Sequence, residues 1–248
     1  MKCFFCAPIL MLLLISMQTD SFKTAQMQNS RVKNAYLSKE KGILDLLADK
    51  KLDVKKLNIF LRIFKSEKVI EVWGKNNPDK NYILLTEFDI CTTSGSLGPK
   101  RREGDGQMPE GFYKIFHFNP QSNFHLSLGV SYPNESDKIL GYKSALGGAI
   151  YIHGNCVTIG CFPITDDKIE ELYILAVEAK NNGQAVIPVH IFPCHFTDAN
   201  VKALKQQHES DKALMAFWEN IKTGYEYFEK NKALPNISVD AKGSYVFK

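Results

Sequence analysis

Residues 149–167 read A-I-Y-I-H-G-N-C-V-T-I-G-C-F-P-I-T-D-D and carry the local signals that decide how the centre of this chain folds. The apolar, β-branched run that ends at His153 predicts a buried strand. Gly160 permits a tight turn directly before Cys161. Thr165, followed by two acids, supplies the N-cap and first-turn residues that begin a helix. The stretch therefore predicts a strand, a turn and a helix, with the cysteine at the corner.

The same stretch supplies a candidate nucleophile, Cys161, and a candidate base, His153. A cysteine nucleophile needs a base that takes its proton and backbone N–H groups that hold an oxyanion. The nearby helix N-terminus is expected to lower the pKa of the thiol below its ordinary value of about 8.5. From the residues alone, an inert buried thiol and a core histidine are open alternatives.

The order His-Gly, a short gap and Gly-Cys at residues 153–161 resembles the signature of the L,D-transpeptidase (YkuD-like) catalytic domain family. Residues 153–173 resemble its YafK-like branch more closely, and blocks at 90–113 and 118–134 resemble the same branch. The resemblance covers residues 58–195. It implies a mainly β fold with flanking helices, of the α+β class, in which a β-sandwich-like L,D-transpeptidase catalytic core carries N- and C-terminal helices.

The resemblance also implies a role for each residue of the motif. Cys161 is expected to be the nucleophile and His153 the general base, with the backbone carbonyl of Gly154 orienting the imidazole. Backbone N–H groups expected to hold the oxyanion are those of Gly160, Cys161 and Ile159. Ile159 and Pro163 stand where most family members have a histidine and an arginine, which leaves the substrate and the direction of the reaction open.

A Gly- and Pro-rich stretch, residues 92–111, predicts a long loop of the kind that is usually functional in a compact domain. Its basic run, residues 100–102, is a candidate clamp for the carboxylates of an acidic stem peptide, although a solvated charge run is the favoured alternative. The candidate substrate-binding residues are Lys100, Asp105, Gln107 and Thr158. Asp105 is also expected to brace the loop, and His125 is interpreted as structural.

Cys156 has three interpretations from the sequence: a disulfide partner of Cys161, which would block catalysis, a structural thiol, which is favoured, or a metal ligand. A zinc site would draw on a set of five residues, namely His153, Cys156, Cys161, Cys194 and His195. The set lacks the paired spacing typical of zinc sites. The sequence therefore predicts neither a metal nor a cofactor.

The composition is that of an ordinary soluble globular chain, with 248 residues, 23% charged and 44% hydrophobic. The net charge of +4 is small and its signs are interspersed, so no nucleic-acid partner is predicted. At the N-terminus, Lys2 precedes an apolar run over residues 3–17 that is too short to span a bilayer comfortably. This pattern predicts an export signal, a periplasmic or cell-envelope location, and membrane contact only through that signal, with an uncleaved membrane anchor as the alternative.

The chain divides into a signal peptide at 1–21, an N-terminal linker and helix at 22–56, the catalytic domain at 57–195, and a C-terminal helical extension and tail at 196–248. Residues 22–30 are predicted to be disordered, and a helix over 31–50 is interrupted at Gly42. Predicted strands lie at 57–64, 68–73, 82–91, 112–118, 123–130, 148–153 and 185–192. Predicted helices begin at Thr165, ending near Gly183, and span 211–230.

Taken together, the resemblance implies an exported cysteine enzyme that acts on peptidoglycan stem peptides through a thioester acyl-enzyme. An amine acceptor would give transpeptidation and water would give hydrolysis, and the sequence does not separate the two outcomes. The expected partner is peptidoglycan, and a murein-linked envelope protein is a further candidate. Two alternatives stay open: a non-catalytic wall-binding module with a structural Cys156–Cys161 disulfide, and a zinc hydrolase.

Overall fold

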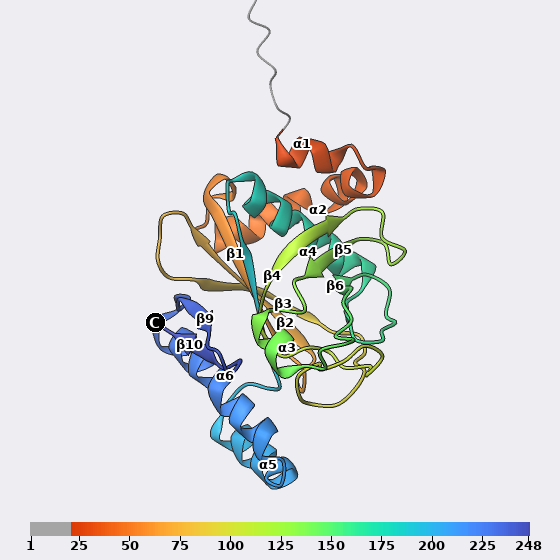
Figure 1. The fold of residues 1–248 in the computed structure, drawn as a ribbon. Helices are drawn as coiled ribbons and strands as arrows, with labels where there is room; N and C mark the ends of the chain where they lie inside the picture. Colours follow the sequence, from red (N-terminus) through yellow and green to blue (C-terminus); the bar gives the residue numbers. More distant parts are fainter. Residues whose placement is uncertain (1–20) are drawn as a thin grey trace, which may run out of the picture.

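The computed structural model describes residues 21–248, and its centre is one mixed sheet of eight strands (Figure 1). The strands lie side by side in the order β3-β2-β1-β8-β4-β5-β6-β7. Their bounds are β1 Leu57–Phe64, β2 Val69–Asn76, β3 Ile83–Asp89, β4 Gly111–Asn119, β5 Ser127–Val130, β6 Ile150–His153, β7 Phe162–Pro163 and β8 Ile187–Phe192. The predicted mainly β, α+β fold with helices toward both ends is confirmed, with its strands in a single curled sheet.

Helices cover the sheet and fill the connections between its strands. Their bounds are α1 Phe22–Met27, α2 Ser30–Asp49, α3 Glu135–Leu140, α4 Asp166–Asn181, α5 Asp198–His208 and α6 Lys212–Asn231. A single 3₁₀ turn, Val54–Lys56, leads into β1. After α6, a short antiparallel pair of strands, β9 Ile237–Val239 and β10 Tyr245–Phe247, ends the chain. No helix of residues 21–248 is long and apolar enough to cross a membrane.

Strand β1 shows why both faces of the sheet are covered. Side chains alternate between the faces of a strand. Its odd-numbered residues from 59 to 63 are aliphatic and join the core beneath α2 and α4. Its even-numbered residues, Phe60, Arg62 and Phe64, are equally buried, and they contact aromatic rings of α6 on the opposite face. The alternating aliphatic residues of this stretch predict the buried face toward α2 and α4, but they do not indicate that the opposite face is buried as well.

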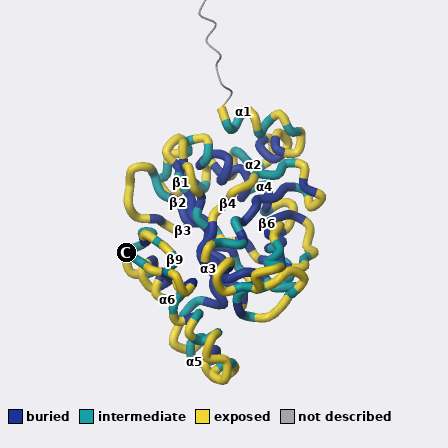
Figure 2. The backbone as a smooth tube through the Cα atoms, viewed as in Figure 1, coloured by how far each residue is buried: buried dark blue, intermediate teal, exposed yellow. Residues whose placement is uncertain are grey.

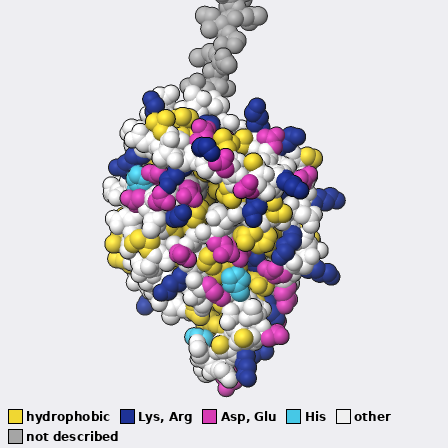
Figure 3. Space-filling view, turned by 180° about the vertical axis from the view of Figure 1, so that it is seen from behind, with side chains coloured by type: hydrophobic (Ala, Val, Ile, Leu, Met, Phe, Trp, Pro, Cys, Tyr) yellow, Lys and Arg dark blue, Asp and Glu magenta, His cyan; other side chains and the backbone are white. Residues whose placement is uncertain are grey.

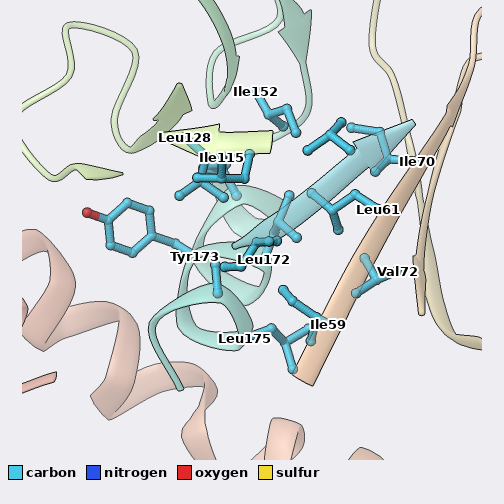
Figure 4. Close-up of a cluster of buried hydrophobic side chains, with 14 of the residues drawn as sticks. Ile59, Leu61, Ile70, Val72, Ile115, Leu128, Ile152, Leu172, Tyr173 and Leu175 are labelled. Atoms are coloured by element: carbon cyan, nitrogen blue, oxygen red, sulfur yellow. The ribbon is translucent and has the colours of Figure 1, made fainter. Parts of the chain in front are cut away.

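The main core lies between the sheet and α4. Figure 4 shows side chains from β1, β2, β4, β5, β6 and α4 meeting in this cluster, among them Leu61, Leu128, Ile152 and Leu172. Figure 2 shows the buried backbone passing through the centre of the molecule, whereas α5 and the outer loops are exposed. Each large aliphatic side chain buried in this way contributes about 1.5–3 kcal/mol to folding. The resulting rigid sheet fixes the strand ends from which the site is built.

The N-terminal predictions need correction. Residues 22–30 are not disordered, because α1 forms there with Ser21 as its N-cap and the ring of Phe22 packs edge-on against Phe118, with 5.0 Å between centroids. Helix α2 also continues through Gly42 without interruption. That glycine lies on the solvent side, where no neighbouring atom would meet a side chain. The predicted signal peptide, apart from Ser21, lies outside the described residues.

The other predicted elements vary in accuracy at their ends. The predicted strand over 123–130 is shorter, because residues up to His125, which has a φ of 66°, form a turn before β5 begins. Helix α4 begins as predicted, with Thr165 as its N-cap and two acids in its first turn.

On the surface, Figure 3 shows basic and acidic side chains intermingled on the face seen from behind.

Candidate active site

Parallel pairing of β6 and β7 places Cys161 and His153 on the same face of the sheet edge. The register pairs Ile152 with Phe162 and His153 with Pro163. Ile152 and Phe162 are fully buried in the core. Because side chains alternate along a strand, His153 and the residue before Phe162, which is Cys161, both point to the opposite face. The Sγ atom of Cys161 lies there, 3.5 Å from the carbonyl oxygen of Ala149.

The imidazole of His153 is held by the backbone of the next residue. Its Nδ1 lies 2.5 Å from the carbonyl oxygen of Gly154. A carbonyl oxygen only accepts hydrogen bonds, so we assign the proton to Nδ1, which leaves the lone pair on Nε2. Burial lowers the pKa of His153 below its ordinary value, and the contact with Gly154 opposes this shift. The ring, packed against Phe124 with 4.6 Å between centroids, is therefore neutral near pH 7 and able to accept a proton.

The first residue of α4 fixes the loop that follows His153. The carboxylate of Asp166 accepts a hydrogen bond from the backbone N–H of Asn155 at 2.7 Å. A Cβ atom at Gly154 would overlap this carboxylate and would lie 2.9 Å from the carbonyl oxygen of Phe124. Only glycine therefore lets the chain pass between α4 and the residues around Phe124 while its carbonyl faces the imidazole.

The predicted low pKa of the Cys161 thiol is wrong. Burial raises the pKa of Cys161 above its ordinary value, while the N–H of Tyr151 and the positive charge of Lys100 act in the opposite direction. Helix α4 begins only at Asp166, and the backbone N–H of Cys161 is bound locally by Thr158 rather than directed at the sulfur. The resting site thus holds a neutral thiol and a neutral imidazole rather than an ion pair.

Two side-chain hydroxyls bind the turn that carries the cysteine. The hydroxyl of Thr158 accepts from the N–H of Cys161 at 2.8 Å and is also 2.8 Å from its carbonyl oxygen. The hydroxyl of Ser94 accepts from the N–H of Gly160 at 2.7 Å. Gly160 has a φ of 104°, and a Cβ atom there would lie 3.1 Å from the carbonyl oxygen of Gln107. The turn and the loop over residues 92–111 therefore meet at position 160, where the positive φ and the close contact with Gln107 both call for glycine.

Ser94 is a site residue that residue-by-residue reasoning missed, although it lies in one of the blocks that resemble the family. Its contact also bears on the predicted oxyanion donors. The N–H groups of Gly160 and Cys161 are both occupied by hydroxyls. Within the described part of the chain, the N–H of Ile159 makes no hydrogen bond, and this residue is 87% exposed.

The loop over residues 92–111 is organised around Asp105. Its carboxylate pairs with Lys100 at 2.5 Å and accepts the backbone N–H groups of Arg101, Arg102 and Gln107 at 3.0–3.1 Å. Burial opposes ionisation of Asp105, but Lys100 and these N–H groups hold its pKa below the ordinary value. The carboxylate thus shapes the loop from within and stays ionised.

The predicted basic clamp is not assembled as one unit. Lys100 is buried, and its ammonium binds the Asp105 carboxylate and the carbonyl oxygen of Arg102. The Arg101 guanidinium lies instead 3.4 Å from Asp137 and over the ring of Phe217 in α6. The side chain of Gln107 binds the loop backbone at Ser96 and Gly98. These contacts explain how the loop keeps its shape, and they leave the substrate-binding roles of these residues as predictions.

A buried ion pair, which the sequence did not indicate, ties the same loop to β1 and α6. The ammonium of Lys65 lies 3.0 Å from the Glu110 carboxylate and donates to the carbonyl oxygens of Gly98 and Met108, both at 2.9 Å. The second oxygen of Glu110 accepts the indole N–H of Trp218 at 2.7 Å. Because each charge is hydrogen-bonded on several sides, this buried pair fixes the loop base.

Cys156 has a bonding partner that the sequence did not predict. It forms a disulfide with Cys91, with 5.3 Å between the Cα atoms, so it is neither a structural thiol nor the partner of Cys161. Within residues 21–248, Cys161 and Cys194 are the free cysteines. A wall-binding module built on a Cys156–Cys161 disulfide is therefore contradicted. Sequence spacing could not have paired positions that are 65 residues apart.

The residues considered for zinc lie in two separate places. His195 contacts Glu67 at 3.3 Å and Glu71 at 3.0 Å, close to β2 and β8, whereas His153 lies at the end of β6. In residues 21–248, no three His, Cys, Asp or Glu side chains are grouped closely enough to hold a metal ion. His125 contacts Glu170 of α4 at 2.8 Å, as a structural residue would.

The chain is similar to proteins of one known family. The L,D-transpeptidase catalytic domain family, YkuD, matches residues 59–191. A protein of Escherichia coli (strain K12) named "Putative L,D-transpeptidase YafK" is 37% identical over 190 residues, which cover 76% of this chain and 73% of that protein. Its counterpart in Escherichia coli O157:H7 matches equally.

Among solved structures, the helical cell shape determining protein Pgp2 from Campylobacter jejuni aligns with a TM-score of 0.45 and 18% identity, over 75% of this chain and 73% of that one. Bd1075 from Bdellovibrio bacteriovorus aligns with a TM-score of 0.39 and 19% identity, over 70% of this chain and 60% of that one.

Proposed function

Because this chain belongs to the L,D-transpeptidase catalytic domain (YkuD) family, we propose that it is an exported cysteine enzyme that acts on the stem peptides of peptidoglycan. Cys161 serves as the nucleophile and His153 as the general base. Murein is the substrate, and a murein-linked envelope protein is a candidate second partner. The proposal is more specific than the family assignment, and the site geometry supplies its support.

One observation carries the proposal: the Gly154 carbonyl binds Nδ1 of His153, so that Nε2 is the proton acceptor on the face that holds Cys161. A cysteine nucleophile with a raised pKa needs a nearby neutral base to remove its proton during attack. The lowered pKa of His153 keeps that base neutral. A backbone carbonyl thus takes the place of the carboxylate that orients the histidine in many triads.

The reaction proceeds in two half-reactions, acylation of the thiol and then deacylation of the thioester. In the first, Nε2 of His153 takes the Sγ proton as the sulfur of Cys161 attacks the carbonyl that follows the L-centre of a diaminopimelate-type residue. The C–N bond breaks, the leaving amine takes the proton from His153, and a thioester remains on the sulfur. In the second half, an amine or water gives a proton to Nε2 of His153 as it attacks the thioester carbonyl. The C–S bond then breaks, and His153 returns the proton to the sulfur, which restores the thiol.

The oxyanion of each half-reaction is held by the N–H of Ile159, because the Ser94 and Thr158 hydroxyls already occupy the N–H groups of Gly160 and Cys161 and hold the turn in shape. Lys100, whose ammonium is paired with Asp105 and whose positive charge favours the Cys161 thiolate, is the proposed contact for a stem-peptide carboxylate. Asp105, Gln107 and Thr158 act on the substrate through the loop and the turn that they hold.

The test is mass spectrometry of muropeptides after incubation with the purified protein, with and without an added amine such as glycine. Hydrolysis shortens the stem peptide, and transpeptidation replaces the lost residue with the amine. A covalent adduct on Cys161, trapped by rapid acid quench, identifies the thioester. If wild-type protein leaves every stem unchanged under both conditions and forms no adduct, the proposed enzyme activity is wrong. Export is tested separately by fractionating cells that express the chain with and without residues 1–21.

A further inference from the structure

We propose that the Cys91–Cys156 disulfide positions Cys161 for reaction and keeps the sulfur of Cys156 from combining with it. The inference rests on the proposed function of Cys161. It assigns to the disulfide a role in the site itself. Two separate features carry it: the segments that the disulfide joins, and the short distance along the chain between Cys156 and the nucleophile.

The disulfide ties the nucleophile turn to the strand edge beside it. Cys91 follows β3, and its N–H donates to the carbonyl oxygen of Pro163 in β7 at 2.9 Å. Cys156 lies in the connection from β6 to β7, which carries Cys161 at its end. The connection is thus anchored at its far end by the sheet and near its start by the disulfide.

The anchored segment has little packing of its own. Val157 is 50% exposed and Ile159 is 87% exposed, and Asn155 and Cys156 are exposed as well. Exposed segments with few buried contacts open at low free energy. The side-chain groups that hold this turn are the Thr158 hydroxyl within it and, from outside, the Ser94 hydroxyl at Gly160 and the Asp166 carboxylate at Asn155.

Ser94 depends on Cys91 for its position. It stands shortly after Cys91 at the start of the loop, and its hydroxyl holds the N–H of Gly160 at 2.7 Å. The Cys91–Cys156 bond joins the chain that carries Ser94 covalently to the turn that carries Gly160. We infer that the sulfur of Cys161 is held beside the carbonyl oxygen of Ala149, 3.5 Å away, only while this arrangement persists. Displacement of a reacting atom by about 1 Å can cost about 100-fold in rate.

The same bond removes a competing thiol. If Cys156 were free, its thiol and that of Cys161 could join into a disulfide with release of two protons and two electrons to an oxidant such as oxidised glutathione. That pairing would consume the nucleophile. In an oxidising compartment, where disulfides persist, prior bonding of Cys156 to Cys91 leaves Cys161 as a thiol. Cys194 poses no such risk, because it is 2% exposed in a cluster that includes Phe64 and Trp218.

Three variants separate the two roles. Cys91→Ser/Cys156→Ser removes the disulfide without leaving a stray thiol, and Cys91→Ser alone removes it and frees Cys156. Cys194→Ala is the matched control, since it deletes a cysteine far from the turn. For each, kcat and KM on muropeptides, the pH profile of Cys161 alkylation by iodoacetamide, and thermal unfolding are measured.

We expect the double variant to lose about 10- to 100-fold in kcat with a smaller change in KM, and to shift its alkylation profile to lower pH, toward the ordinary thiol value of about 8.5. The reason for that shift is that a released turn exposes the thiol, and burial is the largest cause of its raised pKa. With oxidised glutathione, Cys91→Ser should lose its residual activity and gain an internal Cys156–Cys161 disulfide, visible by peptide mass mapping and reversed by dithiothreitol. The double variant and Cys194→Ala should show no such bond.

Ser94→Ala provides a test that leaves the disulfide intact, so it applies even if the cysteine variants fold poorly. It should lower kcat in the same direction, and Ser94→Thr, which keeps the hydroxyl, should restore it. A double variant with wild-type kcat and alkylation profile overturns the positioning role. Full activity of Cys91→Ser under oxidised glutathione overturns the protective role. Wild-type protein that leaves muropeptides unchanged would instead refute the proposed function, and the alkylation profiles would still test the disulfide.

Discussion

Residues 21–248 contain two free cysteines with a histidine close by, and the two neighbourhoods differ in what binds the histidine. At Cys161, the nearby His153 is bound by the carbonyl oxygen of Gly154. At Cys194, the adjacent His195 lies between the carboxylates of Glu67 and Glu71 and stacks on a phenyl ring. The residue types are the same, yet the first pair suits proton transfer and the second does not.

The difference lies in charge. Burial acts to lower the pKa of His195, but its hydrogen bonds to Glu67 and Glu71 outweigh this effect and raise the pKa to about 9. A protonated imidazole donates from both nitrogens and has no lone pair for a base. Burial also raises the pKa of Cys194 to about 12, so its thiol is inert. A carbonyl partner therefore leaves a histidine available as a base, whereas two carboxylates turn it into a fixed cation.

The largest expected effect comes from deleting each cysteine in turn. Cys161→Ala should remove muropeptide turnover, to below about a hundredth of the wild-type rate, because no other described thiol is both free and accessible. Cys194→Ala should keep most of the turnover. Rates of stem conversion by mass spectrometry, with circular dichroism as a check on folding, decide the matter. Comparable losses in both variants would erase the distinction between the neighbourhoods.

Substitution of each histidine in turn gives the next largest expected effect. His153→Ala should lower kcat by about 100- to 10,000-fold, the range typical of a lost general base. His195→Gln should leave kcat within a few-fold of the wild-type value, because His195 contacts Glu67 and Glu71 and has no proposed role in the reaction. Steady-state kinetics of both variants provide the comparison. Retained turnover in His153→Ala would show that another group removes the thiol proton.

The pH dependence sharpens the contrast further. Because burial raises the pKa of Cys161, iodoacetamide should modify it with a midpoint above the ordinary thiol value of about 8.5, and Cys194 should stay unmodified over the same range. Because the pKa of His153 lies below its ordinary value of 6.5, kcat/KM should fall only as pH drops below about 6.5. Peptide mapping of alkylated protein and a pH–rate profile measure the two midpoints. An alkylation midpoint well below 8.5 would mean that the resting site holds a thiolate.

The smallest effect concerns stability. The pKa of His195 rises from about 6.5 in the unfolded chain to about 9 in the folded one, so its protonated form stabilises the fold. That contribution is complete below pH 6.5 and disappears as pH rises through 9. His195→Gln should therefore lower the free energy of unfolding by about 1–2 kcal/mol at pH 6 and by little above pH 9. Urea titrations at both values test it, and an equal loss at both would argue against the charge.

What the sequence predicted well depends on local signals. The strand ending at His153, the turn at Gly160 and the helix capped by Thr165 all follow from neighbouring residues, and the structure contains each of them. The family resemblance is confirmed by the match over residues 59–191. The roles of the individual site residues stay predictions.

What the sequence did not predict depends on distant residues. The partner of Cys156 is 65 positions away, and Ser94 reaches Gly160 from a separate loop. The prediction of a lowered pKa for the Cys161 thiol was wrong because the burial of Cys161 outweighs any effect of a nearby helix. Helix α1 was missed because a short polar segment gains its stability from packing, here between Phe22 and Phe118.

The order of strands has a consequence for how the chain is made. Strand β8, the last of the large sheet to leave the ribosome, lies between β1 and β4, parallel to the first and antiparallel to the second. Until Ile187–Phe192 emerges, the strands of the two sides of the sheet have no partner between them, because β8 is the strand that joins β1 to β4. Translation thus supplies the middle of the sheet after both of its sides, and a chain that stalls before Ile187 exposes two edges to chaperones or to other unfinished chains.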